Sequence, residues 1–365
     1  GSNVFVGCNS GKRALGSSNI FLGSAAGCGA SGTATGSYNM AFGFESFDRF
    51  TTGSENIFLG HHAGRCTTTG SNNLIFGQGA GGCGTLTGGH NILMGHCTAM
   101  CITSASHNIL IGDCAAVMNT VTGTYNTGVG KQSLCKLSSG SFNVAMGWMA
   151  GNNTSDQSAN TFIGMSAGSS TNQYGNTAVG ECAGRRNTDG AQNVAIGQAA
   201  GPNVAGFAGI GTGSYNTHVG ACAGCKTTLG DSNVFLGFKA GKETTTGCNN
   251  IAIGSSVEVS SPTGSCQLAI GYNGSCWITG NSSFNVGIGT DTDAAVTSAN
   301  TQKLSVGIVS AYQFYGDASQ MTGAGFTQDS NCNLIAGKCA GTCAGASPSS
   351  FNIILGCGTG CFNGN

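Results

Sequence analysis

A five-residue motif recurs along almost the whole chain: Asn, an apolar residue, a variable residue, a second apolar residue and Gly. Copies read NIFLG at residues 56–60, NILIG at 108–112 and NIAIG at 250–254. We call the first residue of each copy the anchor and count later positions from it, so that anchor+2 of Asn56 is Phe58. Such a repeat must be recognised first, because it decides the fold.

The anchors are spaced by about one turn of a small solenoid. Nine of the sixteen intervals between the seventeen anchors measure 17 residues, and most of the others measure 16 or 18. All anchors but one are Asn, and every anchor+4 residue is Gly. The anchors are Asn3, Asn19, Asn39, Asn56, Asn73, Asn91, Asn108, Asn126, Asn143, Asn160, Asn176, Asn193, Asn216, Asn233, Asn250, Gln267 and Asn285.

A unit of this length cannot bury an apolar face alone, so consecutive copies must stack. We therefore predict an all-β fold, a β-solenoid (β-roll) of about 17-residue coils, each coil containing a short strand that ends at a Gly corner. Stacked coils lie about 4.8 Å apart, which places each anchor above the next. The Asn column predicts an amide ladder pointing inward or along the axis. A simple turn-starting role for each Asn is the alternative.

The two faces of each strand carry the next prediction. Anchor+3 is apolar in all seventeen copies, so we assign it to the coil's own core. Anchor+2 points to the opposite face, and a strand apolar on both faces is buried on both. We therefore predict a homo-oligomer interface at anchor+2, with isolated exposed side chains as the alternative. Its large residues are Phe5, Phe21, Phe58, Ile75, Leu93, Leu110, Phe162 and Phe235.

The repeat is interrupted once. Residues 290–325 lack the motif, and two further anchors follow at Asn333 and Asn352. We predict solenoid repeats over 1–289, a fibre spacer module over 290–325 and resumed repeats over 326–365. Both ends of the sequence fall inside a repeat, so we expect an excerpt of a longer protein.

These runs resemble known fibre proteins. Residues 193–197 and 250–254 resemble the β-roll heads of trimeric autotransporter adhesins, and residues 52–64 are similar to repeats of phage and giant-virus fibre proteins. The stretch 303–323 is similar to a module of phage tail fibres. The resemblance implies a parallel homotrimer in an extracellular or virion-surface attachment fibre. These fibre proteins are usually poor in cysteine, and the chain differs from them in having 19 cysteines.

Sixteen of the 19 cysteines gather in two columns, five or six and nine or ten residues after an anchor, and Cys248, Cys266 and Cys332 stand just before one. Stacked residues about 4.8 Å apart lie within disulfide reach, so bridges between adjacent coils are possible for Cys66, Cys83, Cys97 and Cys114. Cys66 would pair with Cys83, and Cys97 with Cys114. Small thiols that fill tight corners are the main alternative. A redox Cys222/Cys225 pair is a weaker one, and so is a zinc site formed by Cys339, Cys343, Cys357 and Cys361.

Composition excludes several functions. Only 7% of residues are charged and the net charge is −1, so we expect no nucleic-acid partner. No apolar run of 18 residues occurs, so we expect no membrane insertion. We find no catalytic constellation and expect no enzyme, metal or cofactor. We predict a structural or attachment segment with a host-surface receptor or glycan as possible partner, and an ice-binding or carbohydrate-binding solenoid as the alternative.

Overall fold

The computed structural model describes residues 1–30, 34–203, 211–283 and 285–288, and four short strands beyond them. Two compact units emerge, Gly1–Gly307 and Ile308–Asn365. The described residues form strands, turns and bends without any helix, and the first unit is a parallel solenoid with a repeat of about 17 residues. The predicted fold class is confirmed for the single chain.

Nearly every coil contributes one strand of three residues. The strands of the first unit are β1 (Val4–Val6), β2 (Ile20–Leu22), β3 (Met40–Phe42), β4 (Ile57–Leu59), β5 (Leu74–Phe76), β6 (Ile92–Met94), β7 (Ile109–Ile111), β8 (Thr127–Val129), β9 (Val144–Met146), β10 (Thr161–Ile163), β11 (Thr177–Val179), β12 (Val194–Ile196), β13 (Thr217–Val219), β14 (Val234–Leu236), β15 (Ile251–Ile253), β16 (Leu268–Tyr272), β17 (Ser275–Gly280), β18 (Val286–Ile288) and β19 (Leu304–Val306).

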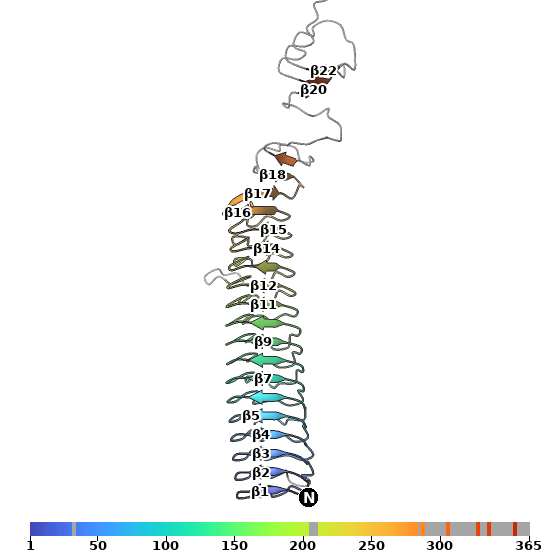
Figure 1. Cartoon of the computed structure of the whole chain (residues 1–365), viewed down its shortest axis with the longest axis vertical. Helices are drawn as coiled ribbons and strands as arrows, with labels where there is room; N and C mark the ends of the chain where they lie inside the picture. Colours follow the sequence, from blue (N-terminus) through green and yellow to red (C-terminus); the bar gives the residue numbers. More distant parts are fainter. Residues whose placement is uncertain are drawn as a thin grey trace, which may run out of the picture. The chain divides into compact units, whose positions relative to one another are not determined.

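Strands β1 to β16 pair in parallel, each with the strand of the next coil (Figure 1). The register places equal repeat positions opposite one another, as Phe58 opposite Ile75 and Phe162 opposite Ala178. The turns also form backbone hydrogen bonds between adjacent coils, for example from His62 N to Phe44 O of the preceding coil at 2.9 Å. Adjacent coils are thus bonded around much of their perimeter, which holds each column in line.

Gly at anchor+4 forms the corner after each of the strands β1 to β15, with positive φ. Gly60 has φ of +138°, and a Cβ added to it would lie 2.7 Å from the carbonyl oxygen of Gly77 in the next coil. The predicted Gly corner is confirmed here, and its reason is that the corner needs both positive φ and a close backbone approach, which Gly permits.

Two positions of the repeat, anchor+2 and anchor+8, share the space inside a coil, and no coil of β1 to β15 has a large apolar side chain at both. Where anchor+2 is Phe, anchor+8 is Gly: a Cβ on Gly168 would lie 2.2 Å from the ring of Phe162. In two coils with a small anchor+2 residue, anchor+8 is large instead: Ala41 is paired with Phe47 and Gly128 with Leu134. The thin interior therefore holds at most one large side chain per coil at these two positions, and the coils anchored at Asn143, Asn176 and Asn193 hold none.

The regular stack ends at a hairpin. β17 pairs antiparallel with β16 and with β18, and Asn273 and Gly274 form the turn. The predicted unbroken run of seventeen coils to residue 289 is therefore wrong at its end, and about 15 coils follow the parallel pattern. The Asn-Gly pair explains the reversal, because it favours the positive φ values of a tight hairpin turn.

Only short strands are described within the predicted spacer and resumed repeats. β19 pairs in parallel with β18, so residues 304–306 of the predicted spacer belong to the sheet of the first unit. In the second unit β20 (Phe326–Gln328) pairs antiparallel with β21 (Leu334–Ala336), which pairs in parallel with β22 (Ile353–Leu355). β21 and β22 directly follow the anchors Asn333 and Asn352, but most of 289–365 lies outside the described residues.

Candidate functional site

The anchor side chains form the predicted ladder inside the coils. Asn39 donates from its backbone N (2.9 Å) and from Nδ2 (3.1 Å) to Oδ1 of Asn19, and its Nδ2 also donates to Gly53 O at 2.9 Å. Asn56 repeats these contacts with Asn39. The bond from backbone N to the preceding side-chain oxygen continues without a gap from Asn3 to Gln267.

The anchors from Asn19 to Asn285 are buried, so the ladder is a core element and not a ligand site. Each amide satisfies buried backbone groups that would otherwise be costly to leave unpaired. Its role is to fix the vertical register of the strands.

The ladder also decides which strand face is outside. Because side chains alternate along a strand, anchor+2 must share the inward face of the anchor, and anchor+1 and anchor+3 must point outward. The structure agrees: Phe21, Phe58 and Phe162 are fully buried, whereas Leu59 is exposed. The assignment of anchor+3 to the core was wrong, since it cannot share a face with an inward anchor.

The predicted interface column is therefore core. Phe21, Phe58, Ile75, Leu93, Leu110, Phe162 and Phe235 all have no exposed surface within the single chain. Phe5 is 36% exposed because it lies in the first coil, where its ring stacks on Phe21 on one side only. None of the seven buried side chains can contact a second copy without unfolding of the coil.

The exposed apolar side chains lie on the outward face of the sheet and not in the predicted anchor+2 column. We define the outward sheet face as the anchor+1 and anchor+3 side chains of β1 to β15. Its anchor+3 column is apolar in every coil, and its anchor+1 column is apolar except for Thr in four coils. The face includes Val4, Val6, Leu22, Met40, Ile57, Leu59, Met94, Ile109, Met146, Ile163, Ile196, Val234, Leu236 and Ile251, each 36–57% exposed.

Aromatic side chains at anchor−1 form a second outward feature that sequence reasoning missed. The rings of His90, His107, Tyr125 and Phe142 stack in consecutive coils with centroids 4.9, 4.8 and 5.1 Å apart. All four are exposed at their edges. Since their common position before an anchor is visible in the sequence, alignment of the repeats would have found them. The ring faces inside the stack are covered by neighbours, so sugar stacking is limited to its ends.

The four cysteines considered for bridges between coils are not joined by disulfide bonds. Cys66, Cys83, Cys97 and Cys114 are all free thiols, so the possible bridges Cys66–Cys83 and Cys97–Cys114 are not formed in the structure. Burial raises the pKa of the Cys97 and Cys114 thiols, and the nearby Asp113 carboxylate raises both further. Cys339, Cys343, Cys357 and Cys361 lie outside the described residues.

The Cys222/Cys225 pair also consists of free thiols. Burial, followed by the charge of Cys222, raises the pKa of Cys225 to about 11. A thiol with so high a pKa is a poor nucleophile at neutral pH, because the thiolate is the reactive form.

Comparisons with known proteins add no relative to this description. Neither the family models, nor the curated proteins, nor the solved structures contain a match to the chain. In the described part of the chain, no helix has the length and apolar character needed to span a membrane.

Proposed function

We propose that this chain is a non-catalytic structural or attachment segment of a fibre, at a virion surface or otherwise outside the cell. In this proposal several copies associate in parallel through the outward sheet face, and the resemblance of the repeats to fibre proteins favours a trimer. The observation that carries the proposal is the continuity of that apolar face over about 15 coils.

The size of the face supports obligate association. Soluble monomers rarely expose contiguous apolar patches beyond a few hundred Å². Leu59 and its equivalents keep roughly two fifths of their surface exposed, so covering one such side chain contributes on the order of 1 kcal/mol. Two columns over the stack give a favourable sum well above the roughly 4–15 kcal/mol that association costs. The free energy of apolar burial therefore exceeds the cost of association by a wide margin.

Parallel assembly follows from the repeat itself. Each coil presents nearly the same pair of apolar side chains at the same height, so copies aligned in one direction keep equivalent columns in contact. Three such faces enclose one apolar interior, whereas two would pack face to face about 10 Å apart. The oligomer number distinguishes the two arrangements.

The test is the molar mass of the purified chain by light scattering and native mass spectrometry. We expect about three times the 36.1 kDa chain mass. Leu59→Glu combined with Met94→Glu places two charges on the outward sheet face and should give monomers or aggregates. The matched controls Thr69→Glu and Thr87→Glu add the same charges to exposed turns and should keep the trimer. A stable monomeric parent chain would contradict the proposal.

A second candidate, ice or carbohydrate binding, rests on four Thr residues in the anchor+1 column: Thr127, Thr161, Thr177 and Thr217. The recurring Thr pairs at the turns do not add to it, because the first Thr of the pair at Thr67 or Thr227 is buried. Inhibition of ice recrystallisation, or glycan binding, by a monomeric parent chain would favour this candidate.

A further inference from the structure

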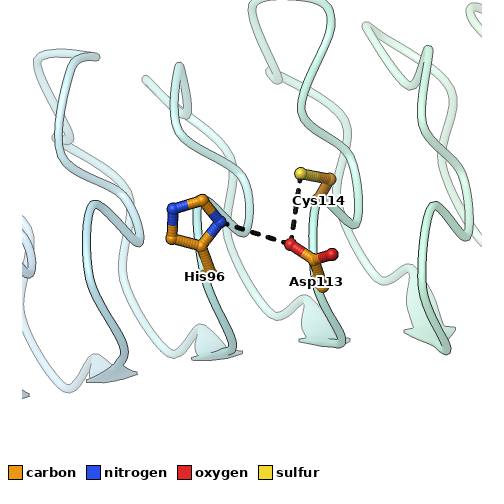
Figure 2. Close-up of side chains that lie close together, drawn as sticks. All are labelled: His96, Asp113 and Cys114. Atoms are coloured by element: carbon orange, nitrogen blue, oxygen red, sulfur yellow. Dashed lines mark hydrogen bonds and ion pairs between the residues drawn. The ribbon is translucent and has the colours of Figure 1, made fainter.

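Three different metal-ligand types converge between two consecutive coils. Figure 2 shows His96, which follows β6, beside Asp113 and Cys114, which follow β7. His96 Nδ1 lies 3.3 Å from Asp113 Oδ1, and the Cys114 thiol donates to the same oxygen at 3.3 Å. The three ligand atoms all lie within 4.8 Å of one another.

We propose that His96, Asp113 and Cys114 form a zinc-binding site. Zinc bonds of about 2.0–2.3 Å in a tetrahedron separate neighbouring ligand atoms by roughly 3.3–3.8 Å. Both contacts to Asp113 Oδ1 fall at this value. The first is long for an imidazolium–carboxylate hydrogen bond, which is typically about 2.8 Å. The third distance, between the ligand atoms of His96 and Cys114, is at most 4.8 Å, and a small side-chain rotation would shorten it to the tetrahedral value.

The donor set favours Zn²⁺ over other divalent cations. Imidazole nitrogen, thiolate and one carboxylate oxygen together suit a borderline-soft ion, whereas Mg²⁺ and Ca²⁺ prefer sites made of oxygen alone. Three protein ligands leave the fourth position to water, which the exposed location of His96 allows. Binding replaces the S–H bond of Cys114 with an S–Zn bond and releases that proton to solvent.

Two neighbours adjust the site. Cys97 Sγ lies 3.4 Å from His96 Nε2, the nitrogen that would not bind the metal, so this contact can hold the ring with Nδ1 facing Asp113. Lys131 Nζ lies 3.1 Å from Asp113 Oδ2 and competes with a cation for the carboxylate. Lys131 therefore weakens binding without being a ligand.

The site is tested by titrating the reduced full chain with Zn²⁺ by calorimetry and with Co²⁺ by absorbance. His96→Ala and Cys114→Ser should each lower the affinity of one ion per chain at least about 10-fold, and Cys114→Ser should remove a thiolate-to-cobalt charge-transfer band. Unchanged stoichiometry, affinity and spectrum in both variants would overturn the proposal.

Two further variants separate this site from the background of other thiols. Cys182→Ser is the matched control, because Cys182 has the same repeat position beside Glu181, but Met165 of the preceding coil stands where a His would be needed. Its metal binding should equal that of the parent chain. Lys131→Gln should tighten binding about 2- to 5-fold. Equal or weaker affinity of this variant would remove Asp113 from the ligand set and with it the site.

Discussion

The imidazole of His218 occupies a core position that is aromatic in other coils. It is 1% exposed, its ring stacks on Phe235 with centroids 5.2 Å apart, and its Nε2 has no hydrogen-bond partner. Burial therefore lowers the pKa of His218 to about 4. The structure accepts the neutral ring only, because a charged imidazolium in this core would lack both solvent and a counter-ion.

This burial predicts a loss of stability in acid. Above pH 6.5 His218 is neutral in both folded and unfolded chains. As the pH falls from 6.5 to about 4, only the unfolded chain binds the proton, so the free energy of unfolding decreases by about 3 kcal/mol. His218→Phe should abolish that part of the decrease, as measured by urea unfolding at pH 7 and pH 4.5. His107→Phe, in an exposed stack, is the control and should keep the parent's pH dependence. Identical profiles for all three chains would contradict the prediction.

At the scale of one coil, the interior is a shared volume and not a fixed set of residues. Phe162 fills it from the strand, and Gly168 leaves room opposite. In another coil Phe47 fills it from the opposite side over Ala41, with φ of +53° at Phe47. Both arrangements place one ring in the same thin layer.

A swap within one coil should therefore be tolerated better than either half of it. Phe162→Ala alone leaves a cavity and should cost about 3–5 kcal/mol. Gly168→Phe alone forces two rings into one layer and should be at least as harmful. The double variant should recover about 1–3 kcal/mol relative to the sum of the two. Urea unfolding of the four chains measures this coupling, and strictly additive losses would exclude shared volume.

The repeat unit shows which structural features could be predicted from the sequence and which could not. The period, the strand positions and the Gly corners could be predicted because they recur in every copy. The orientation of the strand could not be decided from apolarity, because anchor+2 and anchor+3 of Asn56 are both apolar. The available signal was the alternation of side chains along a strand, because a residue two positions after an inward Asn must also point inward. The hairpin turn could also have been predicted, from the Asn-Gly pair at Asn273. The His96 cluster could not, because its residues come from two coils and meet only when these coils stack.

Across the first unit, each coil depends on its immediate neighbours alone. The interval from Asn193 to Asn216 is 23 residues, yet Val194 still pairs with Thr217 in register. Asn216 N also still donates to Asn193 Oδ1, so the ladder and sheet keep their alignment across the longer interval. Stability in such an array is close to a sum over coils and their interfaces.

Removal of a whole coil is therefore expected to be mild. Deleting residues 143–159 would bring Asn160 onto Asn126 and Phe162 next to Leu134. The same succession, a large anchor+8 residue followed by a Phe at anchor+2, already occurs at Phe47 and Phe58, whose rings stack at 4.5 Å. Thermal unfolding should remain cooperative with a small shift in midpoint. Deleting only residues 143–150 is the control and should prevent folding; equal effects would contradict the prediction.

The hydrogen bonds that join one coil to the next give the stack an unusual response to mechanical load. They run along the stacking direction, so tension applied to the two ends of the stack acts on successive interfaces in series. The terminal coil then detaches first, and each detachment releases about 17 residues, or roughly 55–60 Å of extended chain. A solenoid of this design yields stepwise from its ends and dissipates force in many small extensions.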